Sequence, residues 1–150
     1  MRKLRNTGEP IDIDARLPAV MSLLEETPGL VAAYLYGSYG TPDQTPLSDV
    51  DLAVLFAPGS EPAASDRLQI VSDIMQTLQE EDVSVTVLNR TPAIFQFRVL
   101  ETGRQILCKD PVALADFIEQ VLSRHADYMI DYRAFLEEYD EALVREYDRG

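Results

Sequence analysis

Residues 34–56, YLYGSYGTPDQTPLSDVDLAVLF, hold two apolar runs separated by a polar segment with two prolines. Gly37 and Ser38 follow the first run, and Asp49 and Asp51 open the second. The runs are rich in β-branched, aromatic and small residues, which predicts largely buried strands over 30–36 and 49–56. Residues able to bind a ligand or take part in catalysis therefore lie at the end of the first predicted core strand and at the start of the second.

These four residues predict a site for a metal-bound phosphate. A Gly-Ser turn lets the backbone bend sharply and present N–H groups and a hydroxyl to a phosphate. Asp49 and Asp51 are two residues apart on a strand, so their carboxylates share one face, roughly 7 Å apart along the chain. Two adjacent carboxylates favour a divalent cation, and Mg²⁺ commonly binds one or two carboxylates together with substrate phosphates. The chemistry expected is in-line phosphoryl or nucleotidyl transfer; the plain alternative is an ordinary turn followed by an exposed strand.

The rest of the chain predicts an α+β fold with one small mixed sheet flanked by helices. We expect Asp14 to cap a first helix, a second helix over 65–81, and a strand over 82–89 that points Ser84 and Thr86 away from its valines. A short helix closed by Gly103, a strand at 104–108, and one long or two broken helices from Pro111 should follow. We interpret residues 1–150 as a single domain, with a polar lead-in at 1–11 and a C-terminal helical segment at 111–150.

The composition excludes several classes of partner. Twenty-six acidic residues against 13 Lys and Arg give a net charge of -13, which disfavours direct nucleic-acid binding. The same charge either attracts divalent cations or a basic protein, or serves only to keep a small protein soluble. No apolar run reaches membrane-spanning length, so we expect no membrane association. A lone cysteine, Cys108, cannot form an internal disulfide, which fits a cytoplasmic protein.

The pattern Gly37-Ser38, ten residues, then Asp49-Val50-Asp51 resembles the signature of the DNA polymerase β-like nucleotidyltransferase superfamily. The downstream stretches VTVLNRTPAIFQFRVLETGRQIL and LSRHADYMIDYRAFLEEYDEAL extend the likeness. From about residue 14 onward, the chain resembles the minimal nucleotidyltransferase (MntA-type) antitoxins of HEPN/MNT toxin–antitoxin systems.

The resemblance implies a nucleotidyltransferase fold and a role for each signature residue. Gly37 and Ser38 would hold the triphosphate of ATP, and Asp49 and Asp51 would bind Mg²⁺ and serve catalysis. Members of the family transfer AMP from ATP to a tyrosine of a cognate HEPN RNase toxin and thereby neutralise it. The implied assembly is a hetero-oligomer of this chain with its toxin.

The sequence also departs from the family pattern. Superfamily members commonly carry a third carboxylate on the next strand, where this chain has Ser84; Asp82 lies one pleat earlier and would substitute only if the strand shifts or extends. An arginine that many relatives place soon after Gly-Ser is missing. A catalytically weak or degenerate fold that neutralises its toxin by binding alone is therefore an alternative, and an enzyme with another acceptor is a further one.

Aromatic residues and the single histidine allow two interpretations each. Tyr36 and Tyr39 flank the Gly-Ser turn and would either stack on a nucleobase or pack at the strand edge. His125 does not match the HEPN spacing of arginine and histidine, so a helix-surface role is favoured over an RNase site or a metal ligand. Packing against the sheet is favoured over a partner surface for the helically spaced aromatics Tyr128, Tyr132, Phe135, Tyr139 and Tyr147.

Overall fold

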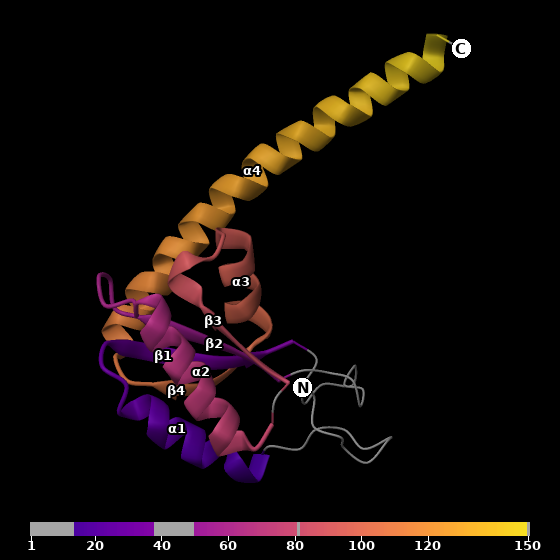
Figure 1. Ribbon diagram of the computed structural model, residues 1–150. Helices are drawn as coiled ribbons and strands as arrows, with labels where there is room; N and C mark the ends of the chain where they lie inside the picture. The colour runs from indigo at the N-terminus through magenta and orange to yellow at the C-terminus, as the bar shows by residue number, and fades with distance from the viewer. Residues whose placement is uncertain (1–13, 38–49, 81, 150) are drawn as a thin grey trace, which may run out of the picture.

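A four-stranded mixed sheet forms the centre of the computed structural model, which describes residues 14–37, 50–80 and 82–149 (Figure 1). The strand order is β3-β2-β1-β4, with β2 and β3 parallel and the other neighbours antiparallel. The strands are β1 (Leu30–Tyr36), β2 (Val50–Phe56), β3 (Val83–Val87) and β4 (Arg104–Cys108). The predicted α+β class with one mixed sheet is confirmed.

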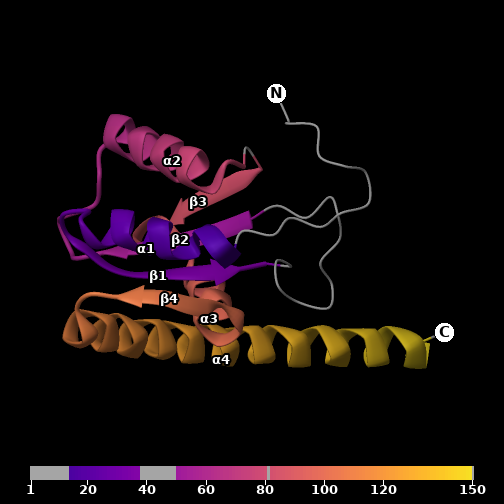
Figure 2. The same ribbon diagram turned by 90° about the horizontal axis from the view of Figure 1, so that it is seen from below.

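Helices cover both faces of this sheet, as Figure 2 shows. One face packs against α1 (Leu17–Glu25) and α2 (Ala64–Leu78), and the other packs against α3 (Ala93–Thr102) and the first half of α4 (Pro111–Arg149). Because side chains alternate along a strand, the central strands β1 and β2 contribute residues to both cores. The cluster under α1 and α2 includes Leu24, Leu35, Leu52, Val54, Ile74, Val83 and Val87. The cluster under α3 and α4 includes Ala32, Tyr34, Ala53, Leu55, Leu88, Val99 and Leu114.

The first helix does not begin as the sequence suggests. Asp14 lies in a 3-10 turn, Asp14–Arg16, and the residue at the N-cap of α1 is Arg16, without a side-chain cap. A proline, Pro18, stands in the first turn of α1, where its missing N–H costs nothing and its fixed φ suits a helix. The expectation that Asp14 caps this helix is therefore wrong.

The predicted strand over 82–89 is shorter than expected. It spans Val83–Val87, and a 3-10 turn, Leu88–Arg90, replaces its last two residues. Within that turn the Asn89 side chain accepts a hydrogen bond from the Phe56 N–H at 2.9 Å and donates one to the Phe56 carbonyl at 2.7 Å. Asn89 thus pairs with the last residue of β2 as a further strand residue would.

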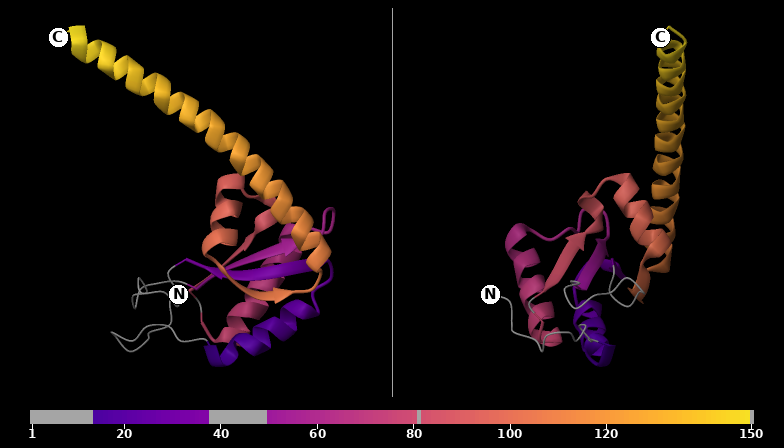
Figure 3. Two further views of the ribbon diagram at one scale, coloured as in Figure 1. Left: turned by 180° about the vertical axis from the view of Figure 1, so that it is seen from behind. Right: turned by 90° about the vertical axis from the view of Figure 1, so that its right-hand side faces the viewer.

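The C-terminal segment is one helix, α4, and its second half projects beyond the sheet (Figures 1 and 3). The side chains of the aromatics expected to pack on the sheet, Tyr128, Tyr132, Phe135, Tyr139 and Tyr147, lie outside what the structure describes, and all of them but Tyr128 belong to this half. The backbone position does not support packing of that segment against this chain's own sheet, and the reason is simple geometry. At 1.5 Å per residue, a straight helix of this length outruns a small sheet. In the part of the chain that the structure describes, no helix is long and apolar enough to cross a membrane.

The Asn89 contact yields a stability prediction. Asn89→Ala leaves the Phe56 N–H and carbonyl without their side-chain partners, and we expect it to lower the free energy of unfolding by about 1–3 kcal/mol. Gln69→Ala, which removes only an exposed hydrogen bond to Asp73 on α2, should cost much less. Chemical denaturation of both variants tests this, and equal stability of the two would contradict it.

Candidate active site

The candidate active site lies where β1 ends and β2 begins. Tyr36 pairs with Asp51 in the antiparallel register of β1 and β2, and Asp51 pairs with Ser84 in the parallel register of β2 and β3. Residues paired in register place their side chains on the same face, so Tyr36, Asp51 and Ser84 form a row across three strands. This is the face that packs against α3, because the flanking Val50 and Leu52 belong to the cluster under α1 and α2.

Gly37 and Asp51 are in close contact. Gly37 has a φ of +82°, in the left-handed region that favours glycine. A Cβ at position 37 would clash with Oδ2 of Asp51 and would lie 3.3 Å from its Cγ. The Asp51 carboxylate therefore occupies the space that any other residue at 37 would need. Both the backbone angle and the space thus require glycine here.

The structure tests the predicted site residues unevenly. Gly37 and Asp51 are brought together, and Ser84 is beside Asp51 as expected. Ser38 and Asp49 lie outside the described residues. Gly37 belongs to the Gly-Ser motif and Asp51 to the Asp-x-Asp motif, so the contact between them brings the two motifs together.

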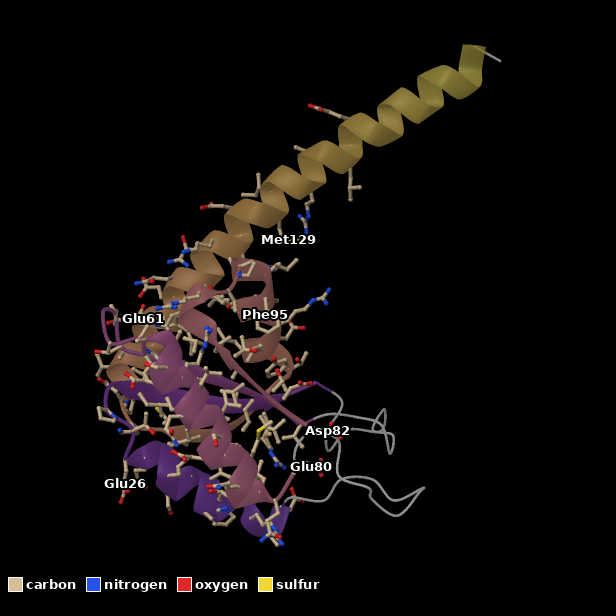
Figure 4. All side chains as sticks on the ribbon, viewed as in Figure 1. Glu26, Glu61, Glu80, Asp82, Phe95 and Met129 are labelled. Atoms are coloured by element: carbon tan, nitrogen blue, oxygen red, sulfur yellow. The ribbon has the colours of Figure 1, made fainter. Side chains whose placement is uncertain are left out.

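Asp82 does not take the place of the third carboxylate within β3. The strand begins at Val83, and the Asp82 carbonyl accepts a hydrogen bond from the Val50 N–H at 2.9 Å. Asp82 N–H in turn donates to Oε1 of Glu80 at 3.2 Å. Figure 4 shows Asp82 and Glu80 at the end of the sheet where β3 begins. The residue in register with Asp51 is Ser84, so the strand does not shift to bring Asp82 there.

Tyr36 is a site residue whose sequence interpretation was open. Its hydroxyl shares a hydrogen bond with Oγ1 of Thr86 at 3.1 Å, and its ring meets Phe95 edge-on with centroids 5.5 Å apart. To reach Thr86 it crosses β2 at Ala53, which pairs with Thr86 and whose small side chain leaves room. The structure thus supports strand-edge packing for Tyr36; Tyr39 lies outside the described residues.

The charge of Asp51 is one of the causes that change the pKa of the Tyr36 hydroxyl. Burial raises the pKa of the Tyr36 hydroxyl above its ordinary value, the hydrogen bond to Thr86 lowers that pKa, and the negative charge of Asp51 raises it. Tyr36 therefore remains a neutral phenol at physiological pH. The sequence signal for this contact is the alternation of VSVTV, which puts Thr86 on the face of Ser84.

Oxygen donors at this end of the sheet suit a hard cation. Asp51 is half-buried beside the glycine turn, and hydroxyl groups of Ser84 and Thr86 follow along β3. Mg²⁺ prefers oxygen ligands and keeps several waters, so one or two carboxylates suffice. Among the residues described, no cluster of three or more His, Cys, Asp or Glu forms a complete protein-only metal site. The donor set therefore fits a cation that shares its coordination with a substrate.

A cavity of about 280 Å³ lies at the opposite end of β2 from Asp51. Its lining includes Phe56, Asn89, Gln96 and Phe117, and it contains none of the predicted site residues. Gln96 is 1% exposed and donates to the Leu88 carbonyl at 2.8 Å, while its Oε1 has no hydrogen-bond partner among the described residues. This cavity is separate from the Asp51 site.

Comparing Gly37 with Gly59 distinguishes the stability cost of a left-handed backbone from the cost of the contact with Asp51. Gly37 and Gly59 share nearly the same φ, +82° and +81°, yet a Cβ at Gly59 meets nothing within 4 Å. Gly59→Ala should therefore lower the free energy of unfolding by about 1–2 kcal/mol through the left-handed backbone alone. We expect Gly37→Ala to cost about 1–3 kcal/mol more, because it must also displace the Asp51 carboxylate. Denaturant titration of both variants measures the difference, and equal costs would show that the contact is unimportant.

Comparison with known proteins places this geometry in a family. The family model described as "Polymerase beta, Nucleotidyltransferase" matches residues 19–112, more than half of the chain. No curated protein matches the chain. The match spans the segment that contains Gly37, Asp51 and Ser84.

Solved structures show the same fold at low sequence identity. A chain of a toxin–antitoxin crystal structure with AMP-PNP has a TM-score of 0.64 and 20% identity, over 83% of this chain and 95% of that chain. A chain of the complex of tri-AMPylated Shewanella oneidensis HEPN toxin with MNT antitoxin has a TM-score of 0.65 and 20% identity, over 85% and 98%. A chain of the toxin–antitoxin MntA-HepT has a TM-score of 0.62 and 19% identity, over 83% and 96%. With the family match, the mixed sheet and the paired glycine turn and carboxylate, the chain belongs to the polymerase β nucleotidyltransferase family.

Proposed function

We propose that this protein is a Mg²⁺-dependent nucleotidyltransferase antitoxin of the cytoplasm, which transfers AMP from ATP to a tyrosine of a cognate HEPN toxin and so neutralises it. The observation that carries the proposal is the contact between the Gly37 turn and the Asp51 carboxylate in a nucleotidyltransferase fold. Support for the acceptor comes from structural relatives, one a complex of a tri-AMPylated HEPN toxin with its MNT antitoxin and another a complex with AMP-PNP.

Each signature residue has a proposed role. Gly37 and Ser38 bind the triphosphate of ATP, since a left-handed glycine allows a phosphate to approach the backbone closely. Asp49 and Asp51 would hold Mg²⁺, which when bound neutralises charge on the phosphates. The Asp51 carboxylate is fixed against Gly37, so the nucleotide-binding turn and the metal-binding strand keep one relative position. Asp51 or a neighbouring group accepts the proton of the attacking hydroxyl.

Ser84 favours a second candidate function. The position in register with Asp51 carries a hydroxyl where many family members have a third carboxylate. A site with one fewer negative ligand binds a divalent cation more weakly. In this alternative the fold retains its partner surface, and the protein neutralises the toxin by occlusion without transferring AMP.

The main test is AMP transfer to the toxin. Purified protein, Mg-ATP and the cognate HEPN protein are mixed, and intact mass spectrometry detects added AMP. Asp51→Asn preserves the shape that packs on Gly37 but removes the charge, and we expect transfer to fall by about 10²–10³-fold; Asp49→Ala should abolish it. Asp66→Asn, on the exposed first turn of α2, is the matched control and should retain full activity. Neutralisation of the toxin by the wild type without a mass shift would favour occlusion and overturn the enzymatic proposal.

A substitution at Ser84 tests whether the missing carboxylate matters. Ser84→Asp adds a negative charge beside Asp51, which should destabilise the metal-free protein through like-charge repulsion. With Mg²⁺ present, we expect the stability to recover and the Mg²⁺ concentration for half-maximal AMP transfer to fall about several-fold. Thermal melts with and without Mg²⁺, compared with Ser84→Ala, measure both effects. A melting temperature of Ser84→Asp that does not respond to Mg²⁺ would argue against a cation at this position.

A further inference from the structure

The two halves of α4 have different surroundings. The first half lies along α3 and the sheet, and Leu114 and Val121 are buried there. The second half extends away from both, as Figures 1 and 3 show. In proteins most helical stability comes from packing of one apolar face rather than from intrinsic propensity. The projecting half therefore calls for a packing partner.

A single stripe of side chains runs along α4 through both halves. We call the α4 stripe the set of described residues spaced by four, three, four and seven positions, which are Ile118, Leu122, His125, Met129 and Leu136. This spacing follows the a and d positions of a heptad repeat, the pattern of helices that pack side by side.

The first half of the α4 stripe already packs on a helix of this chain. The His125 ring stacks on Phe97 of α3, with centroids 3.7 Å apart and planes 4° apart. Ile118 and Leu122 line a hollow with Phe97 and Leu100 of α3. This contact also revises the expected helix-surface role of His125, whose ring is half-buried against α3. The stripe is thus a helix-packing face where α3 is present.

Past the end of α3 the described residues of the stripe are Met129 and Leu136. Figure 4 shows Met129 on α4 near the end of α3, and Met129 is half-buried. One heptad later Leu136 is 38% exposed. The stripe with heptad spacing thus continues beyond the helix that covers its first part. This is the arrangement expected of a helix-in-groove or coiled-coil contact with another protein.

Charge along this segment indicates which partner fits. Residues 126–149 contain eight Asp and Glu against three Arg. Two copies of this chain packed through the segment would bring these like charges together, which is destabilising. A partner helix with an apolar stripe flanked by Lys and Arg would instead gain complementary charge and faster association.

We propose that the α4 stripe from Met129 onward docks a basic, amphipathic helix of the acceptor protein. The identity of that acceptor, the cognate HEPN protein, rests on the proposed function. In this arrangement α4 serves as a two-part packing surface, with α3 covering the first part and the partner helix covering the second. The docking surface is distant from Asp51 in the chain and uses none of the nucleotide-binding residues.

A matched pair of substitutions tests the docking surface. Leu136→Glu places a charge on the stripe, whereas Ala134→Glu places the same charge two residues away, about 200° around the helix. Both sites are exposed, and Glu is a good helix former, so neither change should unfold the protein. We expect Leu136→Glu to weaken binding of the cognate HEPN protein by at least about tenfold in calorimetry without nucleotide. Ala134→Glu should stay within about twofold of wild type, and thermal melts confirm that both variants remain folded.

Three outcomes would overturn the docking proposal. They are equal binding by the two variants, no binding of the HEPN protein by the wild type, and a wild-type homodimer that Leu136→Glu dissociates but Ala134→Glu does not. The last outcome would show a second copy as the occupant. Asp51→Asn should bind like wild type in the same assay. Absence of AMP transfer by the wild type, together with stripe-dependent binding, would refute the enzymatic proposal while leaving the docking surface supported.

Discussion

The candidate site depends on a close contact between the end of β1 and the start of β2. Gly37, directly after β1, has no side chain. The Asp51 carboxylate at the start of β2 occupies the space that a Cβ at position 37 would need. Antiparallel pairing of Tyr36 with Asp51 sets the register that makes this possible. A one-residue slip would turn Asp51 toward α1 and α2, into a cluster of buried aliphatic side chains. Core packing therefore fixes the position of the carboxylate, and the carboxylate in turn requires glycine in the turn.

The alternation of side chains along β3 places its core residues and its polar residues on opposite faces of the sheet. Along β3 the valines enter the core under α1 and α2, while Ser84 and Thr86 lie on the face of Asp51. The Tyr36 hydroxyl ties β1 to β3 across Ala53 through Thr86, and Phe95 of α3 contacts its ring. A neutral hydrogen bond and ring packing thus hold Tyr36 in the row that it forms with Asp51 and Ser84.

Sequence patterns predicted β1 and β2 well because these two strands are largely buried. The run at 30–36 matches β1, and the valine alternation of β3 gave the correct faces. Helix ends were harder, since Pro18 rather than Asp14 marks the first turn of α1. The early end of β3 depends on Asn89 reaching Phe56, 33 residues away, which local pattern does not encode. Contacts through space, such as Phe97 with His125, likewise leave no periodic signal in the sequence.

Within the candidate site, sequence motifs predicted a chemistry but not the packing around it. The Gly-Ser and Asp-x-Asp spacing pointed to Gly37 and Asp51, and the structure adds why these two need one another. The binding and catalytic roles of all four residues remain sequence-based predictions, and Ser38 and Asp49 lie outside the described residues.

The position of β4 has a consequence for how the chain folds. β4 pairs with β1 at Ala32 and Cys108, and the Lys109 N–H donates to the Val31 carbonyl at 2.7 Å. These partners are far apart in the chain, so closing the loop between them carries an entropy cost that slows folding. During synthesis from the N-terminus, β1 leaves the ribosome well before β4 and keeps one backbone edge open until β4 arrives. An unpaired edge of this kind is a template for aggregation, so the nascent chain is most exposed to it in that interval.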